Sequence, residues 1–147
     1  MSGYKNIYII KETMSKTEVN SLIRDCDVFV SLHRAEGFGL VIAEAMLVGT
    51  PVIATNWSAN VDFMNEKNSC PVKYELKEIG EDCFLYKAYQ KWAEPDLDDA
   101  AEYMKKLLSD KDYYNSLKEN AKDFIKSEFS VEKSAEAIKK RISEIVG

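Results

Sequence analysis

A short glycine-rich segment next to an acidic residue is the first place in the chain where chemistry is expected. Gly37 and Gly39 bracket Phe38 in the run Glu36-Gly37-Phe38-Gly39-Leu40. Glycines at this spacing allow a ligand to approach the backbone closely. If a helix begins here, its first N–H groups and its positive dipole end favour an anion such as a diphosphate. A Gly-x-Gly pattern is weak evidence by itself, so the neighbouring glutamates decide how it is interpreted.

Glu44 is the only ionisable residue between Gly37 and Val61, and it falls in an otherwise apolar helical segment. A carboxylate in such surroundings is costly unless hydrogen bonds or an opposite charge stabilise it. Two partners would serve: the vicinal hydroxyls of a ribose, or a lysine or arginine from elsewhere in the chain. Glu44 lies about five residues into the expected helix, roughly 7–8 Å from its start. That separation suits the span from a diphosphate to a ribose and leaves Glu36 to face a sugar at the other end.

Strands and helices alternate around this candidate site. Ser15 and Glu18 form a capping box that predicts a helix over 16–25. Gly49 is expected to end a second helix over 39–48. Apolar runs predict buried strands over 7–10, 28–30, 51–54 and 70–73. Strands joined through helices by short connections predict a Rossmann-like parallel sheet of the α/β class.

The second half of the chain is predicted to be helical. Ser58 could cap a short helix through Phe63, and longer helices are expected after Pro95-Asp96, over 114–124 and after Ser130. The connection over 74–94 has no clear period and is predicted to be irregular. Each long helix has an apolar stripe that we interpret as core packing. The stripes are Leu97, Ala100, Ala101, Met104 and Leu108, then Tyr114, Leu117, Ala121 and Phe124, then Val131, Ala135, Ile138, Ile142 and Ile145.

Composition narrows the classes of partner. A chain of 147 residues with 46 % hydrophobic content is long enough for one domain with a core. The net charge of −5 disfavours nucleic acid or an anionic membrane as the main partner. No apolar run approaches the roughly 20 residues that span a bilayer. The odd number of cysteines, without metal-ligand spacing, indicates free thiols in a reducing compartment and predicts a cytoplasmic protein.

The run from Glu36 to Glu44 resembles the Glu-x7-Glu signature of glycosyltransferase family 4, the group 1 transferases. The similarity continues through 49–55 and, with Trp92-Ala93-Glu94-Pro95-Asp96, extends over essentially the whole chain. The resemblance implies a GT-B fold, in which two Rossmann-like domains share the substrates and the C-terminal one binds most of a nucleotide-sugar donor. Residues 1–147 would then be that donor-binding domain, an excised C-terminal piece of a longer enzyme.

The family's functional residues can be carried onto this sequence one by one. Glu36 would contact the hydroxyls of the donor hexose, and Glu44 would contact the ribose. His33 is a second candidate for the donor sugar, or else a residue that structures the loop. The backbone of Gly37, Phe38, Gly39 and Leu40 would contact the sugar and the diphosphate, and Thr13 and Met14 would line the nucleobase pocket.

The resemblance also implies a retaining hexosyl transfer that needs no metal or other cofactor. The nucleoside diphosphate would depart through an oxocarbenium-like state, with the protein stabilising the leaving group's charge. The acceptor would be a saccharide, a lipid-linked sugar or a growing polysaccharide, bound through a missing N-terminal domain. The full-length enzyme could then lie peripherally at the inner face of the membrane. The family's diphosphate-binding arginine and lysine belong to an upstream segment, so this chain is expected to bind donor weakly and to be inactive on its own.

Other interpretations stay open at this stage. The main alternative is a non-catalytic nucleotide-sugar binding or interaction module with the same fold; a nucleotide-sugar epimerase has no support from the motif. Asp25-Cys26-Asp27 matches the Asp-x-Asp metal motif of the other major transferase fold, but it falls at a helix-to-strand junction, so no metal site is predicted. Arg34 could approach a phosphate or form an ion pair. The sequence does not name the donor, although it resembles a branch that tilts toward GDP-mannose-type donors.

Overall fold

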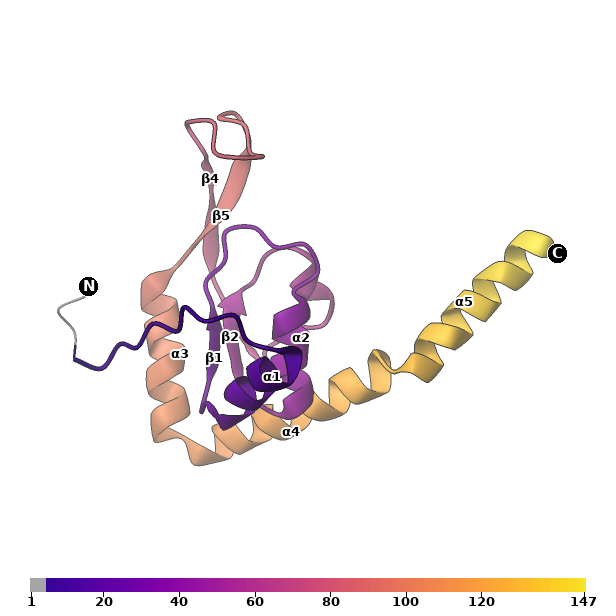
Figure 1. Ribbon diagram of the computed structural model, residues 1–147, viewed down its shortest axis with the longest axis horizontal. Coiled ribbons are helices and arrows are strands. Elements are labelled where there is room, and N and C mark those ends of the chain that lie inside the picture. Colours follow the sequence, from indigo (N-terminus) through magenta and orange to yellow (C-terminus); the bar gives the residue numbers. More distant parts are fainter. Residues whose placement is uncertain (1–4) are drawn as a thin grey trace.

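The computed structural model describes residues 5–147, which form an α/β body from which a β-hairpin and a long helix project (Figure 1). Three parallel strands lie in the order β1-β2-β3, with Val30 opposite Ile53 and Ile53 opposite Cys70. The strands are β1 (Phe29–Ser31), β2 (Val52–Thr55) and β3 (Cys70–Val72). The helices are α1 (Lys16–Asp25), α2 (Leu40–Val48), the 3-10 helix η1 (Ala59–Asp62), α3 (Leu97–Ser109), α4 (Lys111–Glu128) and α5 (Val131–Val146). The predicted α/β class is confirmed.

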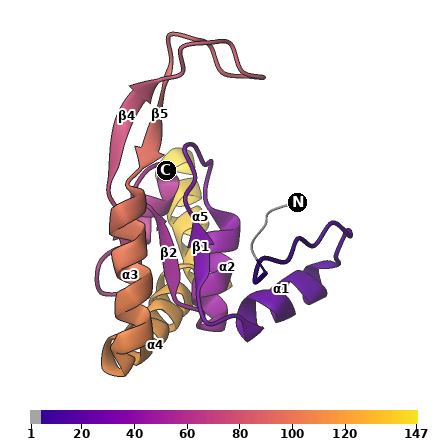
Figure 2. The same ribbon diagram turned by 90° about the vertical axis from the view of Figure 1, so that its left-hand side faces the viewer.

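The parallel sheet separates two hydrophobic cores because successive side chains of β2 point to opposite faces. Val52 and Ala54 pack in the core formed with α1 and α2, whereas Ile53 packs in the core formed with α3. Figure 2 shows the sheet between α3 on one side and α2 on the other. Helix α4 contributes to both cores, with Ala121 in the first and Leu117 in the second. The sheet is therefore covered on both faces, as parallel sheets usually are.

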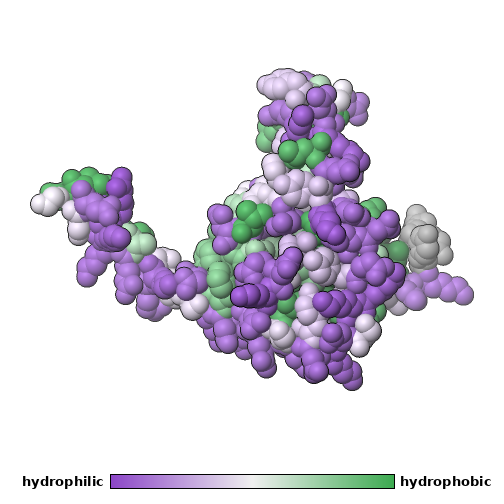
Figure 3. Space-filling model, turned by 180° about the vertical axis from the view of Figure 1, so that it is seen from behind, coloured by the Kyte–Doolittle hydropathy of each residue, from purple (hydrophilic) through white to green (hydrophobic). Residues whose placement is uncertain are grey.

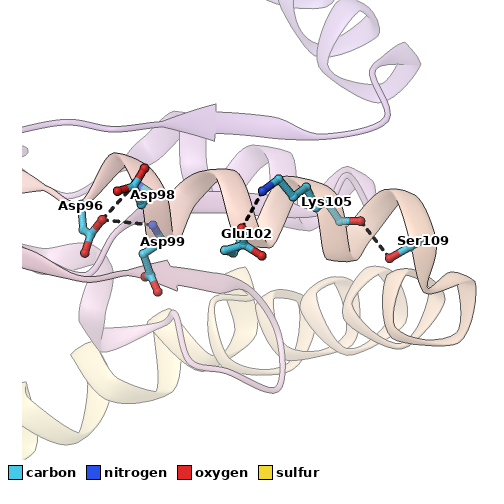
Figure 4. Close-up of polar contacts among 6 residues, drawn as sticks. All are labelled: Asp96, Asp98, Asp99, Glu102, Lys105 and Ser109. Carbon is cyan, nitrogen blue, oxygen red and sulfur yellow. Dashed lines mark hydrogen bonds and ion pairs between the residues drawn. The ribbon is translucent and has the colours of Figure 1, made fainter.

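Local capping explains where the helices begin. Ser15 accepts a hydrogen bond from the Glu18 N–H, and the Glu18 carboxylate accepts one from the Ser15 N–H at 2.7 Å, so the predicted capping box is confirmed. At the start of α3 the Asp96 carboxylate accepts from the N–H groups of Asp98 and Asp99 at 3.0 and 3.1 Å (Figure 4). These caps satisfy donors that the helices themselves leave free. The helices predicted over 16–25 and 39–48 are confirmed to within one residue.

The predicted strand over 7–10 is wrong. These residues do not pair with any strand in the described part of the chain, and their apolar side chains are exposed, with Tyr8 at 87 %. Within residues 5–147, β1 pairs only with β2. A strand needs hydrogen-bonded neighbours, so an apolar run does not produce one unless a partner edge lies alongside.

The segment predicted to be irregular, 74–94, contains an antiparallel hairpin. Strand β4 (Tyr74–Glu78) pairs with β5 (Lys91–Pro95), and Leu76 is opposite Ala93. The hairpin begins two residues after β3 and stands out from the body in Figures 1 and 2. Its strands are short and carry charged residues on both faces, which hides the two-residue period that strand prediction relies on.

The prediction that the apolar stripe of α5 packs in the core is wrong. Ser130 caps the helix as predicted, accepting from the Lys133 N–H at 3.1 Å, but no residue of α5 is buried. Figure 3 shows α5 extending away from the body, with hydrophobic residues at its surface. The stripe of α4 is confirmed as core. That of α3 is partly wrong, because Leu97, Met104 and Leu108 are exposed and Leu107 is buried instead.

Candidate functional site

The glycine-rich segment lies in the loop between β1 and α2, at the carboxyl edge of the parallel sheet. Gly39 has φ +84°, a left-handed conformation that favours glycine. A Cβ built at Gly39 would lie 3.2 Å from the Asn60 Cβ and 3.4 Å from the Phe63 Cζ, whereas one at Gly37 would meet nothing within 4 Å. Gly39 is therefore required by the fold itself, and Gly37 is the glycine that leaves open space beside the backbone.

Helix α2 differs from the other α-helices of residues 5–147 at its start. Side chains of Ser15, Asp96, Asp110 and Ser130 cap α1, α3, α4 and α5, but no side chain hydrogen-bonds to the first N–H groups of α2. Those donors and the helix dipole remain directed at whatever lies before the helix. The start of α2 therefore has the properties of an anion site.

Glu36 lies on the exposed side of the same loop. One of its carboxylate oxygens accepts a hydrogen bond from the Gly37 N–H at 2.8 Å, which turns the side chain back on its own loop. Its backbone N–H faces the Ser58 hydroxyl at 3.4 Å. The predicted contact of Glu36 with a hexose stays a prediction, and it requires the carboxylate to turn outward from Gly37.

His33 has hydrogen-bond partners on both ring nitrogens. Its Nδ1 lies 3.2 Å from the Ser31 hydroxyl, and its Nε2 lies 3.1 Å from the Trp57 carbonyl oxygen. A carbonyl can only accept, so Nε2 carries the proton and Nδ1 accepts from the serine hydroxyl. The structure therefore supports the loop-structuring alternative for His33, while its contact with a donor sugar stays a prediction.

The segment 56–58, which we call the strap, connects β2 to η1 across the same edge of the sheet. Within the strap, Ser58 has φ +76° and ψ −166°. This region is almost exclusive to glycine and costs other residues on the order of 1–3 kcal/mol. The prediction that Ser58 caps the following helix is wrong, since its side chain makes no capping bond there. Asn60, fully buried behind the strap, donates to the Thr55 carbonyl oxygen at 2.9 Å.

Glu44 projects from α2 toward the start of α1. One carboxylate oxygen forms an ion pair with the Lys16 ammonium group, while the other oxygen is buried without a hydrogen-bond partner in the structure. The side chain of Glu44 is 18 % exposed and that of Lys16 is 61 % exposed. The lysine alternative named from the sequence is thus present, but it satisfies only half of the carboxylate. The ribose contact of Glu44 stays a prediction.

A hollow of about 390 Å³ borders Glu44 on the side facing α4. Glu44 is its one charged lining residue, and the other walls are apolar. Ligand sites commonly combine apolar walls with a few polar groups that fix orientation. The other lining residues are Phe38, Leu40, Ala43, Leu47, Ile125 and Phe129.

Arg34 is bound by the hairpin rather than free for a phosphate. Its guanidinium makes two 2.8 Å contacts with the Glu94 carboxylate, and its carbonyl oxygen accepts from the Ala93 N–H at 3.0 Å. It also lies over the Trp92 ring, 4.8 Å from the ring centroid. The hydrogen bonds from Arg34 hold the pKa of the Glu94 carboxyl below its usual range. The ion-pair alternative for Arg34 is confirmed, and strand β5 fixes the beginning of the candidate loop.

Residues 5–147 lack two features, a metal-binding cluster and a membrane-spanning helix. They contain no group of three or more histidine, cysteine or acidic side chains placed to hold a metal ion. None of the helices in this part of the chain is long and apolar enough to cross a membrane.

The fold brings most of the predicted site residues to one edge of the sheet. His33 and Glu36 follow β1, and the strap follows β2. The Lys16–Glu44 pair links the start of α1 to α2, and Thr13 and Met14 lie just before α1; their place in a nucleobase pocket stays a prediction. Sequence reasoning missed the hydroxyl of Ser58 and the hairpin that holds Arg34. Neither leaves a clear local pattern, because both depend on contacts between segments distant in sequence.

Comparisons with known proteins agree with this geometry. Residues 3–74 match the model of the family described as glycosyl transferases group 1. Among solved structures, the chain resembles the C-terminal domain of a glycosyl transferase group 1 family protein (LpcC) from Francisella tularensis, with a TM-score of 0.58 and 23 % identity. That match covers 85 % of this chain and 53 % of the other, so this chain spans about half of the solved one. No curated protein matches the sequence. The family match over residues 3–74, which include the candidate site, and the shared fold support a domain of the group 1 glycosyltransferase kind, similar to the C-terminal half of a GT-B fold.

Proposed function

We propose that this domain binds the nucleotide-sugar donor of a retaining glycosyltransferase, with the nucleotide lying along the start of α2. The observation that carries the proposal is the second carboxylate oxygen of Glu44, which is buried without a donor. Leaving a buried polar group unpaired costs about 1–3 kcal/mol, more when it is charged. The hydroxyls of a ribose would supply that missing donor, and an apolar hollow lies beside it.

Lys16 forms an ion pair with the same carboxylate. The Lys16 side chain is mostly exposed, so its ammonium group can return to water when a ligand takes its place, whereas the Glu44 carboxylate, 18 % exposed, still needs a partner. A ribose could therefore replace Lys16 at Glu44 or share the carboxylate with it. In either arrangement the second oxygen gains a partner.

The remaining roles follow from the order of groups along this edge. The uncapped N–H groups at the start of α2 would bind the diphosphate and stabilise it as the leaving group, which is why no metal is needed. Glu36, with His33 behind it, would face the hexose. Thr13 and Met14 would lie toward the base, near the Lys16 end of the site.

The activity of the whole protein would be transfer of that hexose, with retention of configuration, to a saccharide or lipid-linked acceptor. Arg34 and Lys16, two cations that precede α2 in the chain, are both engaged in ion pairs. We therefore expect this chain to bind donor without turning it over. The same observation favours the second candidate, a binding module without catalysis.

Calorimetric titration with GDP, UDP and ADP, and with their hexose conjugates, tests the proposal. One nucleotide series should bind, and Glu44→Gln should weaken it about 10-fold or more, because a charge-assisted hydrogen bond is lost. Glu136→Gln, an exposed position on α5, is the matched control and should leave binding unchanged. Unchanged affinity in Glu44→Gln would rule out the ribose assignment. Transfer assays with an acceptor-binding domain supplied would then separate the enzyme from the binding module.

A further inference from the structure

The strap makes two contacts that join it to the predicted sugar end of the site. The Trp57 carbonyl oxygen accepts from His33 Nε2 at 3.1 Å, and the Ser58 hydroxyl lies 3.4 Å from the Glu36 N–H. The strap is itself held, because the Trp57 ring lies 5.2 Å from the Tyr74 ring and the Ser58 carbonyl oxygen accepts from the Val61 N–H at 3.2 Å. Two consecutive residues therefore contact the two residues assigned to the hexose: Trp57 contacts the His33 side chain and Ser58 contacts the Glu36 backbone.

Ser58 has a strained backbone conformation inside the candidate site. Among residues 5–147, the only non-glycine residues with positive φ are Ser58 and Phe84. Phe84 lies in the hairpin turn and is 92 % exposed, so its conformation serves a turn in solvent. Ser58 lies inside the candidate site, where such conformations persist only when the surroundings over-determine them.

A glycine at position 58 would adopt the same φ and ψ without that strain. What glycine lacks is the hydroxyl, and the hydroxyl is the group that faces the Glu36 N–H. At 3.4 Å this contact is long for an N–H···O hydrogen bond. Contacts of this kind in ligand-free sites are often loose and tighten when substrate binds.

We propose that Ser58 is a positioning residue for the hexose: its hydroxyl fixes the backbone from which the Glu36 carboxylate reaches the sugar. This inference rests on the proposed function, since it requires Glu36 to contact a donor hexose. Holding the Glu36 backbone lets the carboxylate leave the Gly37 N–H and turn to the sugar while the loop keeps its place. The backbone strain at Ser58 then lowers the stability of the fold, and in return the Glu36 carboxylate is oriented toward the sugar.

The test compares wild type, Ser58→Ala and Ser58→Gly with Glu36→Gln as a reference. For each protein, the ratio of the dissociation constants for a nucleoside diphosphate and for its hexose conjugate measures the contribution of the sugar. Both Ser58 variants should lower this ratio about 5-fold, the value of one neutral hydrogen bond, and leave nucleoside diphosphate affinity within 2-fold. A residue that merely stabilised the fold would change both affinities together, and that result would overturn the proposal.

Two measurements on the free protein accompany the titrations. Ser58→Gly should raise the Tm by roughly 2–8 °C, because the strain is relieved, while Ser58→Ala keeps the strain and should not. Hydrogen exchange at the Glu36 amide should be about 5-fold faster in both variants than in wild type. An unchanged exchange rate at the Glu36 amide, or no rise in Tm for Ser58→Gly, would overturn the inference whatever affinities the titrations give.

The outcomes also separate this inference from the proposed function. If wild type binds no nucleotide, or if Glu36→Gln keeps the full sugar contribution, the proposed function itself is overturned. If Glu36→Gln loses that contribution and both Ser58 variants retain it, Glu36 acts without Ser58 and only the positioning role is wrong.

Discussion

Helices α4 and α5 have similar apolar stripes, but the stripe of α4 packs in the core and that of α5 is exposed. In α4, Leu117 and Ala121 are at most 1 % exposed and pack against the sheet and its helices. In α5, Ile138 and Ile145 are 61 % and 67 % exposed, and the helix extends into solvent (Figure 1). Helical spacing of apolar residues therefore predicts a helix with one apolar face, but the fold around it decides whether that face is covered.

The largest expected effect contrasts the two stripes directly. Leu117→Ala should lower the free energy of unfolding by about 2–4 kcal/mol, because it leaves a cavity in a closed core. Ile142→Ala, at a position 55 % exposed, should change it by less than about 0.5 kcal/mol. Urea unfolding monitored by circular dichroism measures both. Similar losses in the two variants would mean that α5 is covered in solution and that the contrast does not hold.

A smaller effect contrasts the two glycines of the candidate loop. Gly39→Ala should destabilise the protein by about 1–3 kcal/mol, since its φ is +84° and a Cβ would crowd Asn60 and Phe63. Gly37→Ala has open space around the new methyl group and should cost less than about 0.5 kcal/mol. Equal Tm values for the two variants would contradict the distinct roles given to these residues.

The smallest effect concerns the ion pair that joins the loop to the hairpin. The pKa of Glu94 is lower in the folded protein than in the unfolded chain. The stabilisation from Arg34 is therefore fully present at pH values above the pKa of the unfolded chain, and it is lost as the pH falls through the pKa of the folded protein. The Arg34 Nε–H signal in NMR spectra should therefore shift only at acidic pH, below the range in which an ordinary glutamate titrates. Glu94→Gln should abolish this transition.

Glu75 is the matched control, because it lies directly opposite Glu94 in the hairpin. Like charges facing each other across a strand pair oppose pairing, so Glu75→Gln should leave the hairpin intact or slightly more stable. The acidic transition at Arg34 should persist in that variant. Its loss there would mean that another carboxylate holds Arg34.

The sequence was most informative where local chemistry decides the outcome. The capping box at Ser15 and the left-handed Gly49 place the ends of α1 and α2 because both signals act within one helical turn. The position of His33 and Glu36 just after β1, at the carboxyl edge of the sheet, followed from the parallel topology. The second oxygen of Glu44 could not be predicted, because its lack of a partner depends on the side chains that surround it.

Predictions from the sequence failed where contacts with a distant segment determine the local structure. The run over 7–10 has the composition of a buried strand, yet no strand edge lies beside it in residues 5–147. The hairpin over 74–95 is stabilised by pairing and by Arg34, a residue sixty positions away from Glu94. The conformation of Ser58 is likewise fixed by its neighbours in space, whereas serine itself favours other conformations.

The aromatic side chain between the two glycines connects the site to the far end of the chain. Phe38 lies 5.4 Å from Phe63 and 6.2 Å from Phe129, measured between ring centroids, and Phe129 occupies the joint between α4 and α5. Helix α5 has 16 residues and is therefore about 24 Å long. A rotation of about 10° at the joint would move its tip by about 4 Å. The Phe129 ring therefore places the base of α5 beside the glycine-rich loop, so the packing of that one ring sets the direction in which α5 leaves the body.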